Sequence, residues 1–241
     1  MKKILLYSGG MDSWLIDKLW KPDIKLYIDM NTKYSKEEIS RLPQDVILDK
    51  LDLGKWERDD AIIPLRNLYL LMWATNYMDD EGCIITMGCL QGDRSLDKQP
   101  EFCNKAQDLL NHLYQPQWWL PNGRKIEINQ YFKQFTKAEL LKKYIDQGGD
   151  IKKVWDETFS CYHPKDDGTP CRKCKPCQRK VISFYEFGFV DKSWLPDIIP
   201  AIEKDMVPYI KAGTYGRGKK EEDLIMNFYN EYKEYGNRKE I

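Results

Sequence analysis

The chain has no charge bias, only two histidines and no long apolar run. Lys and Arg together number 38, as do Asp and Glu, so the formal net charge is zero. A broad electrostatic surface for nucleic acid is therefore not expected, because such surfaces carry an excess of basic residues. No apolar segment approaches the length of a membrane span, so we expect no membrane-spanning helix.

The N-terminal residues also lack the features of a secretion signal. The two lysines at the start are followed only by a short apolar run from Ile4 to Tyr7, which cannot form the apolar core of a signal peptide. We therefore expect a cytosolic protein whose cysteines are reduced or bound to metal, because disulfides are rare in that compartment. With 241 residues, the chain is one large domain, or one domain with an appendage.

A loop rich in serine and glycine carries the strongest functional indication. It reads Ser8-Gly9-Gly10-Met11-Asp12-Ser13 and lies between a strand-like apolar run and a helical pattern over 14–20. It is not a Walker A loop, because no Gly-Lys-Ser/Thr follows the glycines. Backbone N–H groups and hydroxyls at a helix N-terminus bind phosphate well, and glycines let the backbone approach the anion. This context favours a nucleotide phosphate site over a ligand-free turn.

Short apolar runs alternate with helix-length segments, which predicts an α/β fold with a doubly wound parallel sheet. We expect strands in 4–7, 24–29, 46–48, 83–88 and 126–128, and helices over 62–78, over 100–114 and from Thr136. Ligands of such sheets bind beyond the carboxyl ends of the strands, so the Ser/Gly loop, Asp29, Gly88 and Asp93 are expected to line one cleft. The predicted segments are a nucleotide-binding domain at 1–155, a zinc-binding segment at 156–190 and a helical extension at 191–241.

Four of the seven cysteines have the spacing of a metal site. Cys161, Cys171, Cys174 and Cys177 place three ligands in one tight turn and a fourth across a short loop, which suits a tetrahedral zinc site with four thiolates. Such a closed site is structural, because no position remains for a catalytic water. An iron–sulfur cluster can use the same ligands, whereas disulfides fit poorly with a cytosolic chain. The other cysteines and both histidines are predicted to be structural: Cys83, Cys89, Cys103, His112 and His163.

The Ser8–Ser13 loop resembles the S-G-G-x-D-S signature of the PP-loop ATP pyrophosphatases. Together with the cysteine cluster, it resembles the 7-cyano-7-deazaguanine synthase (QueC) family of that superfamily. Further segments agree in order with motifs of the family, and the resemblance runs from near Lys3 to near Gly188. Ile63-Pro64-Leu65-Arg66-Asn67 resembles the family motif V-P-x-R-N. Gly88 with Asp93 resembles G-x-x-x-x-D, after Met87, and Pro100-Glu101-Phe102 resembles P-E-F. Thr136-Lys137-Ala138-Glu139 resembles S-K-x-E, and Ser160-Cys161-Tyr162 resembles S-C-Y.

The resemblance implies a carbon–nitrogen ligase that converts 7-carboxy-7-deazaguanine and ammonia to 7-cyano-7-deazaguanine, driven by ATP, through an adenylated carboxylate and an amide. It implies ATP, Mg²⁺ and structural Zn²⁺ as cofactors, small-molecule substrates and a homodimer. Catalytic roles are implied for Asp12, Arg66 and Lys137, through Mg²⁺ or phosphate binding. ATP contacts are implied for Tyr7, Ser8, Gly9, Gly10, Met11, Asp12, Ser13, Trp14, Asp29 and Gly88. Substrate contacts are implied for Asn67, Asp93, Asp97, Glu101 and Phe102, and zinc ligation for Cys161, Cys171, Cys174 and Cys177.

The segment before Pro100 departs from the family pattern. Residues 95–99 stand where the family has Y-P-D-C-R, with only Asp97 retained, and the stretch from Asp93 is shorter. Trp14 occupies a position where a small hydroxyl residue is common. Because these changes affect the substrate side more than the ATP side, two alternatives stay open. One is a PP-loop adenylating enzyme that acts on another modified nucleobase, a tRNA base or a protein, and the other is a nucleotide-binding module without turnover.

Overall fold

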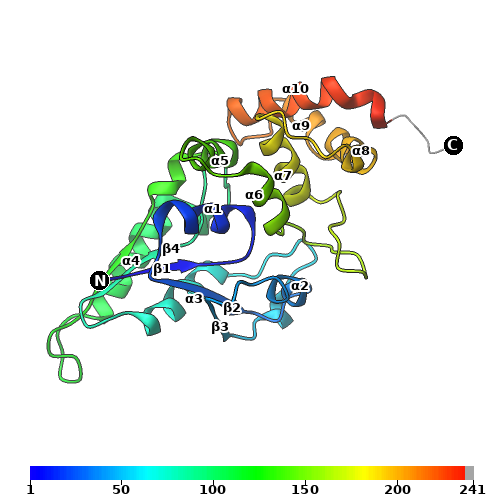
Figure 1. Cartoon of the computed structure of the whole chain (residues 1–241). Coiled ribbons are helices and arrows are strands. Elements are labelled where there is room, and N and C mark those ends of the chain that lie inside the picture. Colours follow the sequence, from blue (N-terminus) through cyan, green and yellow to red (C-terminus); the bar gives the residue numbers. More distant parts are fainter. Residues whose placement is uncertain (237–241) are drawn as a thin grey trace. The chain divides into compact units, whose positions relative to one another are not determined.

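The computed structural model describes residues 1–236, and the chain divides into two compact units, Met1–Gln134 and Phe135–Ile241 (Figure 1). The segment boundaries expected at 155/156 and 190/191 both fall inside the second unit. Among the described residues, no helix has the length and apolar character that crossing a membrane requires.

The first unit is built on a five-stranded sheet in which every neighbouring pair is parallel. The strand order is β3-β2-β1-β4-β5. The register aligns Ile4 of the central strand with Ile24 on one side and Ile85 on the other. The strands are β1 (Lys2–Leu6), β2 (Ile24–Asp29), β3 (Val46–Lys50), β4 (Gly82–Thr86) and β5 (Lys125–Ile128).

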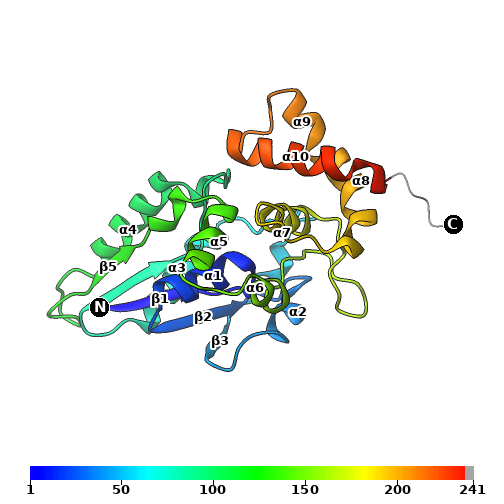
Figure 2. The same ribbon diagram turned by 45° about the horizontal axis from the view of Figure 1, so that its top comes forward.

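Helices cover both faces of this sheet, so the predicted doubly wound α/β fold is confirmed (Figures 1 and 2). Helix α1 (Met11–Trp20) lies on one face, and α3 (Arg66–Ala74) and α4 (Pro100–Leu113) lie on the other. Alternate strand residues pack with α3 and α4 into one apolar core that includes Ile4, Ile85 and Leu110. The remaining elements of the unit are α2 (Ser35–Ile39), η1 (Gly54–Trp56), η2 (Thr75–Tyr77), η3 (Leu96–Lys98) and η4 (Tyr131–Gln134).

The helix expected over 62–78 begins later, at Arg66. Leu65 has a φ of 60°, in the left-handed region that residues with a β-carbon seldom adopt. Pro64 also disfavours helical geometry at Ile63 before it. The chain therefore turns just ahead of α3, and Arg66 and Asn67 become its first two residues.

The winding of the sheet reverses between β1 and β4. From β1 the chain continues through β2 to β3 on one side, whereas β4 and β5 lie on the other side. Parallel sheets bind ligands in the crevice beyond the carboxyl ends of the strands at such a switch point. Two connecting segments flank this point: residues 7–10 after β1 and residues 87–99 after β4.

The second unit is helical and has its own apolar core. Val181 and Ile182 of the central helix pack there with Ile198 and Phe228 from the helical extension, and Cys177 belongs to the same core. The predicted extension therefore covers the predicted metal-binding segment. The helices of this unit are α5 (Lys137–Asp146), α6 (Ile151–Glu157), α7 (Lys175–Tyr185), η5 (Lys192–Trp194), α8 (Leu195–Asp205), α9 (Val207–Lys211) and α10 (Lys219–Gly236).

Candidate functional site

The Ser/Gly loop joins β1 to α1 and is held in shape by its own serines. The backbone N–H of Ser8 donates to Oγ of Ser13 (3.1 Å), and the N–H of Gly10 donates to Oγ of Ser8 (3.3 Å). Ser13 is buried, and its hydroxyl donates to the carbonyl of Gly10 (3.1 Å). These hydrogen bonds fix the path of the loop before any ligand binds.

The same loop presents the N-terminus of α1 in a form that suits an anion. Gly10 is the N-cap residue, and it has no side chain that accepts from the first-turn N–H groups. Gly9 has a φ of +69°, and a β-carbon there would meet no atom within 4 Å, so the backbone conformation rather than crowding calls for glycine. First-turn N–H groups and the helix dipole together attract phosphate. The loop therefore has the geometry of a phosphate site.

Three residues expected to contact ATP have buried side chains. Tyr7, Met11 and Trp14 are 3%, 0% and 2% exposed. Side chains this deeply buried offer almost no surface to a ligand, so the ATP contacts predicted for these three residues stay a prediction that rests on their backbone. Trp14 thereby fills a core position, which explains how a large residue fits this place in the sequence.

The other ATP-side residues lie where strands end or α1 begins. Asp12 is half-buried in the first turn of α1. Asp29 is the last residue of β2, and its Oδ1 accepts from the N–H of Asn31 (2.8 Å). Gly88 follows β4 with a φ of +64°. The topology thus brings these residues to the carboxyl edge of one sheet.

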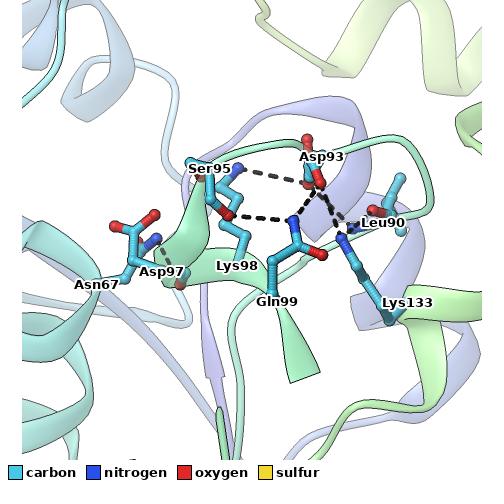
Figure 3. A network of polar contacts seen from close by, with 8 residues as sticks. All are labelled: Asn67, Leu90, Asp93, Ser95, Asp97, Lys98, Gln99 and Lys133. Carbon is cyan, nitrogen blue, oxygen red and sulfur yellow. Dashed lines mark hydrogen bonds and ion pairs between the residues drawn. The ribbon is translucent and has the colours of Figure 1, made fainter. Parts of the chain in front are cut away.

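Asp93 directs its carboxylate back into its own segment (Figure 3). Its Oδ2 accepts from the N–H of Leu90 (3.1 Å) and lies 3.5 Å from Nζ of Lys98. Its side chain is 18% exposed. Asp93, predicted to contact the substrate, therefore also shapes the segment 87–99.

Two further side chains, one from this segment and one from η4, bind its backbone carbonyls (Figure 3). Nε2 of Gln99 donates to the carbonyls of Asp93 (2.5 Å) and Ser95 (3.1 Å). Nζ of Lys133 donates to the carbonyls of Leu90 (3.0 Å) and Asp93 (3.2 Å). The sequence alone did not indicate Lys133 as a partner of this segment, because it comes from the distant turn η4.

The remaining substrate-side residues differ in what their side chains contact. Asn67 is buried, and its Nδ2 donates to the carbonyl of Asp97 (3.2 Å), so α3 supports the segment at η3. Glu101 forms an exposed ion pair with Lys105 one turn along α4 (2.7 Å), and this pair lowers the pKa of Glu101. Phe102 packs against the apolar core of the sheet.

Arg66 belongs to a cluster that sequence patterns did not reveal. Its guanidinium donates to the hydroxyl of Tyr34 (3.5 Å). Nearby, the hydroxyl of Tyr27 donates to Oε2 of Glu38 (2.8 Å). Burial raises the pKa of Glu38 to about 7, while the bond from Tyr27 and the charge of Arg66 act in the opposite direction. The cluster joins β2, α2 and α3, and no local spacing relates these three elements.

A Glu38→Gln variant tests this cluster through the pH dependence of stability. Because the pKa of Glu38 rises from 4.5 to about 7 on folding, the folded state holds the proton more firmly, and stability falls as pH rises through this window. Glutamine still accepts from Tyr27 and carries no charge. We expect the variant to be more stable than the parent at pH 8, by about 1–3 kcal/mol, and by only about a quarter of that difference at pH 5, just above the unfolded pKa of 4.5.

Urea denaturation at the two pH values measures this difference. Glu37→Gln, on the same short helix, controls for the loss of one negative charge. Equal stability of the Glu38→Gln variant and the parent at pH 8 would contradict the raised pKa.

Lys137 is the first residue of α5, in the second unit. The predicted capping box is present there: the N–H of Glu139 donates to Oγ1 of Thr136 (3.1 Å), and the N–H of Thr136 donates to the Glu139 carboxylate (2.9 Å). This pair of bonds fixes the start of the helix and therefore the backbone position of Lys137.

The four clustered cysteines converge on one point in the second unit. Their sulfur atoms all lie within 4.8 Å of one another, and none forms a disulfide. Sγ of Cys174 lies 3.5 Å from Sγ of Cys177 and 4.0 Å from Sγ of Cys161. Tetrahedral zinc with bonds of about 2.3 Å to sulfur separates its ligands by about 3.8 Å. The cluster can therefore hold a metal ion such as zinc.

Backbone N–H groups point at the sulfurs of this cluster. The N–H of Cys171 donates to Sγ of Cys161 (3.2 Å), and those of Lys173 and Cys174 donate to Sγ of Cys171 (3.4 and 3.3 Å). Such bonds stabilise thiolates and orient them toward a metal. Four thiolates leave no open position, which suits a structural centre.

Comparison with known proteins identifies relatives for most of the chain. The family model described as "Queuosine biosynthesis protein QueC" matches residues 25–188. The 7-cyano-7-deazaguanine synthase of Geobacter sp. (strain M21) is 28% identical over 222 residues, which covers 79% of this chain and 96% of that protein. The synthase of Pelobacter propionicus is 29% identical over 228 residues, with the same coverage. No solved structure matches the chain.

The family match ends before the helical extension. Its last residue is 188, whereas α8 begins at Leu195. Helices α8, α9 and α10 therefore lie outside the matched region, although they share an apolar core with Cys161 and Cys177.

Proposed function

The chain belongs to the QueC family, and from that membership we propose that it converts 7-carboxy-7-deazaguanine and ammonia to 7-cyano-7-deazaguanine, driven by ATP. Its matched relatives are named as synthases of this product. One observation supports the proposal above the others: the Ser8–Ser13 loop lies at the switch point of a parallel sheet, with the N-terminus of α1 behind it.

The first half of the proposed reaction turns a carboxylate into an amide. A carboxylate is a poor electrophile, because its carbon is electron-rich and its oxygen leaves badly. Attack of a carboxylate oxygen on the α-phosphorus of ATP forms the acyl adenylate and releases pyrophosphate. Ammonia then attacks the acyl carbon, AMP leaves, and the nitrogen loses a proton.

The second half removes the elements of water from that amide. The amide oxygen attacks the α-phosphorus of a second ATP, and pyrophosphate leaves again. Loss of AMP from carbon and of the remaining protons from nitrogen gives the nitrile. Each nitrile therefore requires two ATP and releases two AMP, with no change of oxidation state that would need a redox partner.

The chain's residues supply charge neutralisation and positioning for these steps. We assign the pyrophosphate end of ATP to the Ser/Gly loop and the α1 N-terminus. Asp12 would hold Mg²⁺, which offsets phosphate charge when bound. Arg66 would bind a phosphate or the substrate carboxylate in bidentate fashion, and Lys137 would bind phosphate as a point charge.

We assign the base to the segment 87–99 after β4, which flanks the switch point of the sheet and would form one wall of the base site. Asp93 and Asp97 supply its carboxylates, and the N–H groups of a guanine-like edge need such acceptors. Asn67 and Lys133 would act from behind this wall, through the carbonyls that they contact.

The test is direct turnover by the purified protein. We expect ATP, ammonia and 7-carboxy-7-deazaguanine to give AMP and the nitrile in a two-to-one ratio, followed by mass spectrometry and chromatography. AMP without nitrile would reject the proposed base and favour adenylation of another substrate. Absence of AMP under all conditions would favour a nucleotide-binding module.

A further inference from the structure

The segment 87–99, which we assign as the base-binding wall, has little regular structure of its own. Between Thr86 and Pro100 the chain forms only the short turn η3. Gly88 and Gly92 within it have positive φ values of 64° and 84°, so the backbone there is able to take several paths. Side-chain contacts, from within the segment and from elsewhere, therefore help to select the path that the structure shows.

Lys133 provides the contact that comes from furthest along the chain. It lies in η4, after β5, and its Nζ reaches the carbonyls of Leu90 (3.0 Å) and Asp93 (3.2 Å) (Figure 3). Within residues 1–236, Lys133 forms no ion pair with a carboxylate. Its half-buried ammonium group is thus directed at two backbone carbonyls, and charge-assisted hydrogen bonds of this kind are stronger than neutral ones.

Gln99 and the Asp93 side chain complete the same closed arrangement. The carbonyl of Asp93 accepts from both Gln99 and Lys133, while its carboxylate accepts from the N–H of Leu90. The N–H of Asp93 donates in turn to the carbonyl of Leu90 (3.2 Å). The turn 90–93 is therefore closed internally, and Lys133 links it to the segment after β5.

We propose that Lys133 is a positioning residue that sets the shape of the base-binding wall, and so determines affinity for the base rather than for ATP. This inference rests on the proposed function, because it assigns the base to the segment after β4. Lys133 acts through backbone carbonyls, so its effect does not depend on the side chains that the wall presents. The Ser/Gly loop is closed by its own serines and contains no contact to Lys133.

The experiment compares Lys133→Met with Lys133→Arg. Methionine keeps most of the length of the side chain and removes its donors, whereas arginine keeps the charge and the donors. We expect the Met variant to raise KM for 7-carboxy-7-deazaguanine by roughly tenfold or more, with kcat and KM for ATP changed by less than about threefold. The Arg variant should recover most of the affinity for the base. Lys125→Met, which removes a lysine that is 67% exposed at the start of β5, is the control.

Hydrogen exchange of peptides covering 88–99 measures how firmly Lys133 holds the turn 90–93, independently of turnover. We expect faster exchange at Leu90 and Asp93 in the Met variant only, because both amides donate within the turn. Unchanged exchange in the Lys133→Met variant would overturn the proposal, even if the parent protein is fully active. Equal rises in the KM for the base and the KM for ATP, together with a lower melting temperature, would overturn it as well. A parent protein that forms AMP but no nitrile would instead reject the proposed substrate and, with it, the pocket assigned to this wall.

Discussion

A Cys177→Ser variant is expected to lose its metal and to melt roughly 10–20 °C below the parent protein. Cys177 is fully buried in the first turn of α7, and its sulfur lies 3.5 Å from that of Cys174. A metal held there ties the loop 160–174 to α7, which lies in the core of the second unit. Serine is a poor ligand for a site of this type, so the loop would lose its anchor and α7 would lose its neighbours.

The size of the effect follows from how metal binding couples to folding. Structural zinc sites contribute several kcal/mol to the stability of the domains that contain them. In a unit of about 100 residues, such as the second unit of this chain, each kcal/mol shifts the melting temperature by about 4–8 °C. A buried cysteine outside any metal site supplies only the packing of a small apolar residue. The cluster position should therefore be much more sensitive to serine than an ordinary core cysteine.

Metal analysis and circular dichroism melting measure this prediction together. Cys103→Ser is the matched control, because Cys103 is 4% exposed in the core of the first unit and lies outside the cluster. We expect the control to retain the full metal content and to shift the melting temperature much less. Equal melting temperatures of the two variants would argue against a metal that supports the fold. Iron and sulfide in the parent protein would show that the four cysteines hold an iron–sulfur cluster and not zinc.

Features that depend on near neighbours in the chain were predictable from the sequence. The Ser8–Ser13 loop is closed by contacts no more than five residues apart, and the cysteine cluster spans only one short loop and a turn. The parallel sheet followed from the alternation of apolar runs and helical segments. In each case, local spacing carries the three-dimensional information.

Contacts between distant segments were not predictable in this way. Lys133 meets the carbonyls of Leu90 and Asp93 across about forty positions, and Arg66 meets the hydroxyl of Tyr34 across about thirty. Neither pairing leaves a periodic pattern, because side chains reach backbone carbonyls or hydroxyls whose positions only the fold determines. The helix boundary at Arg66 was missed for a related reason, since the left-handed φ of Leu65 has no signature in its residue type.

The Ser/Gly loop itself should be the most sensitive position for activity. A Ser13→Ala variant is expected to form AMP about a hundredfold more slowly and to lose only about 1 kcal/mol of stability. The Ser13 hydroxyl accepts from the N–H of Ser8, lies 3.2 Å from the Ser8 hydroxyl and donates to the carbonyl of Gly10. Without it, these groups lose the bonds that aim the loop at a phosphate, whereas the apolar core beneath the loop is unchanged.

Ser183→Ala separates this effect from the general cost of removing a buried hydroxyl. Ser183 is as buried as Ser13, at 4% exposed, but within the described part of the chain its hydroxyl bonds only to the carbonyl of Arg179 in its own helix (2.7 Å). We expect similar stability losses in the two variants and a loss of AMP formation in Ser13→Ala alone. Because preorganised donors act mainly on the transition state, kcat should fall more than KM for ATP rises. A Ser13→Ala variant with undiminished AMP formation would show that the loop does not hold the reacting phosphates.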